Sequence, residues 1–425
     1  MPAVLPAPNF ACLAAVRPSE PVPAAVTPNK AEVRADDACK NDFRYDFGPA
    51  RTAPVLPEGA RYSPLAIRGP IELGASKASP PRKVGILLTS HGDIDDPKTE
   101  LRDYVREAVL KNPGIPLPNW IRPALDTLGW PLERAELFKQ YNIIGPTNYH
   151  RNSTKQTEAV RKAMHRQGLK GKAYVGYNFT HPNIEETIRR MHKDGVTDIV
   201  VFNQGAQCSV ATMGESVHEV EEAIEKFPDW NVRVRAVNSF NDEPEYIDLL
   251  TDRMLGDVRT SFGNQKPEDV LILVSSHGLP DHLVKKGDRA AAEMLKTFDK
   301  VKARLSAKGY QVEHGFLNDD FFPGAEWTGP DLETRVRQIL NQIENGERHP
   351  PKFVLIDGRL SFTVHHRATL YDANVVARNL LENPPISLAG LFDGANVRLA
   401  PNFDGDPRLA HLISKLAKKA LQNPT

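Results

Sequence analysis

Cysteine is scarce in this sequence, and neither sign of charge is in excess. The three cysteines, Cys12, Cys39 and Cys208, lie far apart along the 425-residue chain. They form neither a disulfide framework nor a zinc knuckle, which fits a reducing compartment such as the cytoplasm. Lysine and arginine together number 54, as do aspartate and glutamate, so the formal net charge is zero. A neutral chain lacks the cationic excess on which nucleic-acid binding depends, so we expect no nucleic-acid partner.

Long apolar stretches and the common catalytic motifs are also missing. No run of eighteen apolar residues is present, which excludes a transmembrane helix. There is no Gly-x-Ser-x-Gly motif, no phosphate-binding loop ending in Lys-Ser or Lys-Thr, and no His-Glu-x-x-His motif. With 40% hydrophobic and 25% charged residues, the composition is that of a soluble globular protein.

The first 82 residues form a proline-rich head. Fourteen of the 35 prolines fall between Met1 and Arg82, without any sustained hydrophobic periodicity. Such a segment buries too little apolar surface to offset the entropy lost on ordering, so we expect residues 1–82 to be disordered. The head also lacks a basic stretch followed by an apolar run, which argues against a signal peptide.

From Lys83 onward, short apolar runs alternate with amphipathic helical stretches. The runs have the length of strands and are often unbroken by polar residues, as expected for strands buried on both faces of a parallel sheet. Ile184, Ile188 and Met191 recur at helical spacing and predict a connecting helix between two such runs. Strand–helix–strand order with tight connections predicts an open α/β architecture. The expected strands are 84–88, 174–177, 199–202, 232–237, 270–274 and 353–356.

One apolar strand and its polar end occur twice. Residues 84–92 (VGILLTSHG) align without gaps with residues 270–278 (VLILVSSHG), and six of the nine positions are identical. We interpret this repeat as two similar α/β halves facing a central cleft. Ligands of open parallel sheets bind beyond the carboxyl ends of the strands, so the repeat would direct His91 and His277 into that cleft. The expected domains are residues 83–228 and 229–425.

Four histidines are the candidate functional residues. Neutral imidazole binds iron, cobalt, nickel and zinc, and it titrates near neutral pH. His91 and His277 are therefore candidate metal ligands or proton acceptors, and the alternative for each is a hydrogen bond at a strand end. His365 and His366 follow the strand at residues 353–356. Because adjacent side chains point apart on regular structure, we expect at most one of this pair to face the cleft.

Two other segments each allow two interpretations. Ser209 and Thr212 follow a strand and could line a pocket, although a plain strand-to-helix turn explains them equally well. Cys208 is better explained as a small packing residue than as a metal ligand. Residues 110–130 are apolar but interrupted by prolines. They predict either a hydrophobic lip that contacts a flat ligand or a membrane surface, or ordinary packing against the first half.

Several motifs, in order along residues 83–418, resemble the ferrochelatase family. Residues 274–280 (VSSHGLP) resemble the family signature Ser-Ala-His-Ser/Gly-Leu-Pro. Residues 174–186 resemble its Tyr-x-Gly segment before a Glu-Glu helix, and residues 327–330 (WTGP) resemble Trp-Leu-Gly-Pro. Residues 362–370 (FTVHHRATL) align with Phe-x-Ser-Asp-His-Ile-Glu-Thr-Leu.

This resemblance implies two Rossmann-like domains, each a doubly wound parallel sheet, around a porphyrin into which a divalent metal is inserted. The metal substrate is expected to be Fe²⁺, with Ni²⁺, Co²⁺ and Zn²⁺ as alternatives, in haem biosynthesis or a related tetrapyrrole pathway. No cysteine follows Cys208, so we expect no iron–sulfur cluster of the kind that a cysteine-rich tail holds in some members. The implied site residues are His277 and His91 for catalysis and metal binding, His365 and His366 as further metal ligands, and Tyr177, Gln207, Ser209 and Trp327 as ring contacts.

The departures from the family pattern leave a second function open. The family's acidic partner, the Glu of Asp-His-Ile-Glu, is Ala368 here, and the preceding Asp is His365. Ala368 favours the alternative of a protein that binds haem or porphyrin without inserting metal, whereas His277 favours the enzyme. We expect a cytoplasmic protein whose membrane contact is at most peripheral, through residues 110–130. The sequence does not predict its oligomeric state.

Overall fold

The computed structural model describes residues 82–115, 121–124, 130–318 and 326–422, and the backbone of three short strands in the proline-rich head. Two of these short strands, β1 (Arg44–Asp46) and β2 (Thr52–Pro54), pair antiparallel with each other. The rest of the head lies outside the described residues. The expectation that residues 1–82 are disordered therefore falls mostly on residues that the structure does not describe.

The first sheet consists of β3 (Tyr62–Pro64), β4 (Val84–Ser90), β5 (Gly171–Tyr177), β6 (Asp198–Asn203) and β7 (Arg233–Val237). Its order is β3-β7-β6-β4-β5, and only β3 runs antiparallel to its neighbour. Every residue of β4 and β6 is buried, which explains their largely apolar sequences. β3 is thus part of the head that pairs with the sheet, and Pro64 is tolerated there because β3 is an edge strand.

The second sheet consists of β8 (Val270–His277), β9 (Gln311–Leu317), β10 (Phe353–Asp357) and β11 (Val397–Leu399). All four strands are parallel, in the order β11-β10-β8-β9. In both sheets the parallel strands lie in the order fourth, third, first, second along the chain. The repeat therefore marks two halves of one topology, and the predicted pair of Rossmann-like α/β domains is confirmed.

The same local features recur at equivalent places in the two halves. α5 (Ile184–Lys193) follows β5 and α10 (Leu332–Glu344) follows β9, and each helix is capped by an Asn or Asp side chain. Gly176 and Gly315 lie where these helices approach the strands. A Cβ on Gly176 would lie 3.1 Å from the Cα of Ile184, and one on Gly315 would lie 2.5 Å from the Cα of Leu332. The close helix–strand packing therefore requires glycine at position 315 and leaves little room for a larger residue at position 176.

A π-helical turn follows the third parallel strand of each half. η2 (Val210–Gly214) follows β6 and leads into α6 (Glu215–Glu225), whereas η4 (Thr369–Val376) follows β10 and leads into α11 (Ala377–Glu382). Such turns are rare and often occur at functional sites. The short helices α8 (Asp281–Lys285), η3 (Pro267–Asp269) and η5 (Ile386–Leu388) also belong to the second half.

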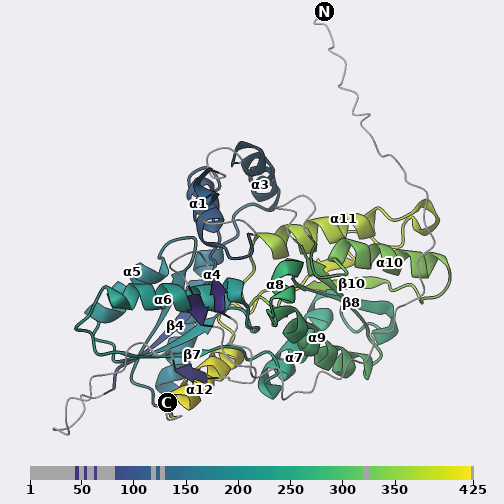
Figure 1. Ribbon diagram of the computed structural model, residues 1–425. Coiled ribbons are helices and arrows are strands. Elements are labelled where there is room, and N and C mark those ends of the chain that lie inside the picture. The colour runs from purple at the N-terminus through teal and green to yellow at the C-terminus, as the bar shows by residue number, and fades with distance from the viewer. Residues whose placement is uncertain are drawn as a thin grey trace, which may run out of the picture. The chain divides into compact units, whose positions relative to one another are not determined.

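The last helix of each half packs on the other half. α7 (Pro244–Phe262) follows β7 but contacts β10 and α9 (Ala290–Ser306). α12 (Pro407–Gln422) follows β11 but contacts α4 (Tyr149–Arg166), β6 and β7, and it lies beside β7 in Figure 1. One apolar cluster accordingly includes buried residues of both sheets. The division expected between residues 228 and 229 therefore falls before β7, which belongs to the first sheet.

α1 (Leu101–Lys111) and α3 (Trp130–Ile144) contact each other at the top of Figure 1, and α3 also contacts η4 of the second half. Ile115 is buried in a cluster with α1 and Tyr141 of α3, so this part of the expected hydrophobic lip packs within the protein. Residues 116–120 and 125–129 lie outside the described residues, and contact with a membrane stays a prediction. In the part of the chain that the structure describes, no helix is long and apolar enough to cross a membrane.

Candidate functional site

The loop after β10, residues 358–368, connects strand ends of both halves. The hydroxyl of Ser361 accepts a hydrogen bond from the backbone N–H of His277 at 3.2 Å. Thr363 donates its N–H at 3.0 Å and its hydroxyl at 2.7 Å to the carbonyl of Gln204, which follows β6. The carboxyl ends of β6, β8 and β10 therefore meet at this loop, as expected for a site built on two facing parallel sheets.

His277 ends β8, and its half-buried ring lies close to two aromatic rings. The ring centroid is 5.8 Å from that of Phe362 and 6.3 Å from that of Trp327. The Nδ1 atom lies 2.6 Å from the carbonyl oxygen of Gly278. Because a carbonyl can only accept, Nδ1 carries the proton, and the neutral ring has its lone pair on Nε2. His277 can therefore accept a proton or bind a metal through Nε2.

Trp327 is half-buried, and its position beside His277 is compatible with the predicted ring contact. Its indole N–H is buried and has no hydrogen-bond partner among the described residues. A buried donor without an acceptor is uncommon in proteins. The aromatic surface beside His277 therefore contains one polar group, the indole N–H of Trp327.

His91 follows β4 and is attached to the π-helical turn of the first half. Its Nε2 atom lies 2.5 Å from the carbonyl oxygen of Ala211 in η2, and its ring stacks on Phe179 with centroids 4.8 Å apart. Nε2 therefore carries the proton, and the neutral ring has its lone pair on Nδ1. His91 and His277 thus occupy equivalent strand ends but present different nitrogens for chemistry.

His365 and His366 point in different directions. His365 is 8% exposed, its Nε2–H donates to the carbonyl of Ala400 at 2.9 Å, and burial lowers the pKa of the ring. His366 packs its ring on Phe362 with centroids 3.9 Å apart. The backbone N–H of Ala368 donates to its Nδ1 at 3.2 Å, which assigns the ring proton of the neutral form to Nε2. Only His366 thus shares a partner ring with His277.

Tyr177, Gln207 and Ser209 are buried, with 1%, 3% and 4% of their surface exposed. Gln207 donates to the carbonyl of Leu360 at 3.0 Å, and Ser209 donates to the carboxylate of Asp288 at 2.7 Å. These contacts join the first half to the second. Direct contact of Tyr177, Gln207 and Ser209 with the ring stays a prediction.

Cys208 has the environment of a packing residue. Burial, and next the negative charge of Glu293, raises the pKa of its thiol to about 12. The thiolate is the form that binds metals, and it is not populated at neutral pH under these conditions.

Asp93 is a functional candidate that the sequence pattern did not single out. Its carboxylate is 1% exposed, and burial raises its pKa to about 6 against the opposing effect of three hydrogen bonds. One of these comes from the backbone N–H of Arg367, at 2.8 Å from Oδ2. The available signal was its place directly after the repeated His-Gly, but Asp95 and Asp96 follow and make the stretch resemble a solvated turn.

The family's carboxylate position contributes no acid here. Ala368 is 2% exposed and packs in the apolar cluster of the second half. Asp372 in η4 forms an ion pair with Arg367, with Oδ2 3.3 Å from Nη1. Across the described ranges, no group of three or more histidine, cysteine, aspartate or glutamate side chains is arranged to hold a metal ion.

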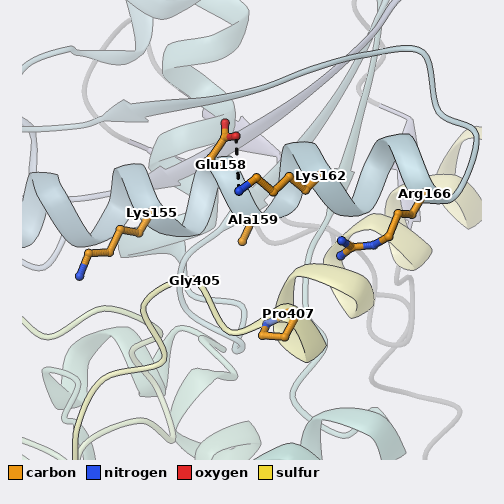
Figure 2. A pocket seen from close by; sticks show the side chains of 7 residues that line it. All are labelled: Lys155, Glu158, Ala159, Lys162, Arg166, Gly405 and Pro407. Atoms are coloured by element: carbon orange, nitrogen blue, oxygen red, sulfur yellow. Dashed lines mark ion pairs between the residues drawn. The ribbon is translucent and has the colours of Figure 1, made fainter.

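A basic groove of about 350 Å³ lies elsewhere, between α4 and the start of α12. Figure 2 shows its cations along α4, where Glu158 forms an ion pair with Lys162 at 4.0 Å. Lys155 pairs with Asp404 at 3.0 Å. None of the candidate histidines lines this groove, which is bordered by Lys155, Glu158, Ala159, Lys162, Arg166, Gly405 and Pro407.

Comparison with known proteins identifies the family. The model of the family described as Ferrochelatase matches residues 83–421. The mitochondrial ferrochelatase of Bos taurus is 25% identical over 348 residues, which cover 80% of this chain and 78% of that protein. The ferrochelatase of Gloeobacter violaceus is 27% identical over 319 residues, which cover 73% of this chain and 90% of that protein.

The chain is also similar to a solved structure, the sirohydrochlorin chelatase SirB from Bacillus subtilis subspecies spizizenii in complex with cobalt. The identity is 13%, the match covers 80% of this chain and 97% of the other, and the TM-score is 0.42. The family match alone covers most of the chain, including both halves and all four histidines. The chain belongs to the ferrochelatase family of tetrapyrrole metal chelatases.

Proposed function

We propose that this protein inserts a divalent metal ion into a porphyrin-type ring, with Fe²⁺ as the metal substrate. The observation that carries the proposal is the position of His277 at the end of β8, with its basic Nε2 and with Phe362 and Trp327 beside it. Aromatic side chains are suited to the flat face of a macrocycle. An imidazole at the same place can bind the metal or accept the protons that the metal displaces.

The reaction requires bases as well as a metal ligand. A free-base porphyrin and M²⁺ give the metalloporphyrin and two protons, so two N–H bonds break as four metal–nitrogen bonds form. The proton acceptors have to be neutral at the working pH, which imidazole satisfies. We assign the first proton, or the incoming metal, to Nε2 of His277, and we assign the equivalent task in the first half to Nδ1 of His91.

His366 is the third member of the proposed site, in preference to His365. Its ring contacts Phe362, which is also next to His277, whereas His365 is buried against Ala400. With Ala368 in place of a carboxylate, the proposed site consists of nitrogen donors. Such sites favour borderline metals over hard ones, so Co²⁺, Ni²⁺ and Zn²⁺ are the alternatives to test beside Fe²⁺.

The test is anaerobic incubation of the full-length protein with protoporphyrin and each of the four metals. We expect the Soret band of the free base to convert to that of the metalloporphyrin at a rate proportional to enzyme. His277→Ala should slow this conversion by about 10²- to 10⁴-fold while the free base still binds. Tight porphyrin binding without conversion by any metal would overturn the proposal and support a non-catalytic binding protein instead.

A further inference from the structure

Asp93 lies in the interior at the junction of three structural elements. Its Oδ1 accepts hydrogen bonds from the phenol of Tyr141 at 2.5 Å and from the N–H of Ile94 at 2.8 Å. Its Oδ2 accepts from the N–H of Arg367 at 2.8 Å. Tyr141 belongs to α3, Ile94 follows β4, and Arg367 belongs to the loop before η4. One carboxylate therefore joins the first sheet, α3 and the second half.

The segment from Thr363 to Arg367 is hydrogen-bonded to the first half at both of its ends. Thr363 donates twice to the carbonyl of Gln204, and Arg367 donates to Asp93. Both acceptors belong to the first half, and His366 lies between the two attachments. The orientation of His366 in the second half therefore depends on contacts that the first half provides.

We propose that Asp93 is a positioning residue for metal insertion, because its carboxylate holds the Arg367 N–H and thereby fixes His366 against Phe362 beside His277. Its importance for catalysis rests on the proposed function, whereas its effect on the orientation of His366 does not. Ala368 leaves the second half without an acidic group at the family position. The first half thus supplies a carboxylate to the same segment from across the interface.

The chemistry of the donors explains why this position needs a carboxylate. Three donors converge on Asp93, and the two oxygens of a carboxylate satisfy all of them. Asparagine has one acceptor oxygen, and its amide group would face at least one of these donors. Asp93→Asn therefore leaves a buried donor without an acceptor and loosens the segment that carries His366.

The first test compares Asp93→Asn with Asp198→Asn. Asp198 is also buried, begins β6 at the opposite end of the same sheet, and pairs with Arg233 at 2.8 Å. We expect Asp93→Asn to lower kcat about 10- to 100-fold, the range in which a misplaced reactive group acts. The KM for porphyrin should change less than about twofold, because the aromatic wall is unchanged. Asp198→Asn should retain the kcat of the wild type.

A second pair of variants isolates the single hydrogen bond without changing Asp93. Arg367→Ala and Arg367→Pro both remove the side chain, but only proline removes the backbone N–H. Arg367 opens a helical turn, where proline is tolerated. We expect Arg367→Pro to lower kcat as much as Asp93→Asn does, and Arg367→Ala to lower it much less. The double variant Asp93→Asn/Arg367→Pro should be no worse than either single one, since both remove the same bond.

A third measurement reports on His366 without turnover. The protein is labelled with [¹³Cε1]histidine, and the signal of His366 is assigned by its loss in His366→Gln. We expect this signal to move in Asp93→Asn and Arg367→Pro and to stay in place in Asp198→Asn. An unmoved His366 signal, or a kcat for Asp93→Asn equal to that of Asp198→Asn, would overturn the inference. If the wild-type protein inserts no metal, the proposed function fails, and the His366 signal still decides whether Asp93 positions this residue.

Discussion

The Nε2 atom of His314 in β9 lies 2.7 Å from the hydroxyl oxygen of Ser276, the residue before His277 in β8. Burial, and next the positive charge of Arg335, lowers the pKa of His314 to about 4. The ring therefore stays neutral at neutral pH and links the two strands directly behind the proposed catalytic imidazole.

This buried histidine predicts a loss of stability in acid. The folded-state pKa lies below the ordinary value of 6.5, so between pH 6.5 and 4 the unfolded chain binds the proton more readily. The contribution of His314 to the free energy of unfolding is complete above pH 6.5 and falls by about 3 kcal/mol as the pH drops to 4. Urea unfolding of wild type and His314→Gln at several pH values measures this difference, because glutamine does not titrate.

A matched control is His165→Gln, which replaces an exposed histidine on α4. It should leave the acid dependence of the wild type unchanged. Identical pH profiles for wild type and His314→Gln would show that burial of His314 does not contribute to acid sensitivity.

His277→Ala is predicted to lower the rate of metal insertion by about 10²- to 10⁴-fold, the usual contribution of a positioned acid or base. The porphyrin dissociation constant, measured by fluorescence quenching, should change little, because the aromatic surface at Phe362 and Trp327 remains. His181→Ala serves as the control, since the His181 side chain is 76% exposed and pairs with Glu186. Wild-type turnover by His277→Ala would remove this residue from the mechanism.

His91→Ala is predicted to be as damaging as His277→Ala. Its Nε2–H donates to the carbonyl of Ala211, so Nδ1 is the basic nitrogen of the neutral ring and the one to which we assign the proton or metal transfer. Initial rates with each metal, measured by the Soret change, test this equivalence. Retention of the wild-type rate would reduce His91 to a hydrogen-bonding residue at a strand end.

Gly315→Ala and Gly256→Ala are predicted to change stability in opposite directions. A Cβ on Gly315 would lie 2.5 Å from the Leu332 backbone, so β9 and α10 would have to separate, at a cost of about 1–3 kcal/mol. Gly256 lies inside α7 with no atom within 4 Å of an added Cβ. There alanine should stabilise by up to about 1 kcal/mol through its better helix propensity. Thermal unfolding of the two variants measures both effects, and a stabilised Gly315→Ala protein would contradict the close packing.

The sequence predicted the two sheets well because the strands are short apolar runs buried on both faces. It also predicted the equivalence of the halves, since the strand ends at His91 and His277 carry the same His-Gly pair. It placed the division before β7 because no local pattern shows which sheet a strand joins. That choice depends on pairing between β6 and β7, and on α7 and α12 crossing to the opposite halves.

Side-chain direction was harder to predict than strand position. The sequence allows Ser209 either to line a pocket or to belong to a plain strand-to-helix turn, and it does not reveal the hydrogen bond of Ser209 to Asp288 of the other half. The position of Asp93 after the repeated His-Gly did not reveal its role, because its partners Tyr141 and Arg367 are 48 and 274 residues away along the chain. Contacts between distant segments decide which polar residues face a ligand, and no spacing rule reports them.

The crossing of α7 and α12 constrains how the two halves can move. Each helix covers the sheet of the half to which it does not belong in chain order, so a wide rotation of the halves would expose the apolar faces of both helices. Because α7 and α12 each pack on the opposite half, the packed helices can slide past each other by small distances, but the halves cannot open about a hinge. The two halves should also unfold together, because each loses the helix that covers its sheet when the other half unfolds.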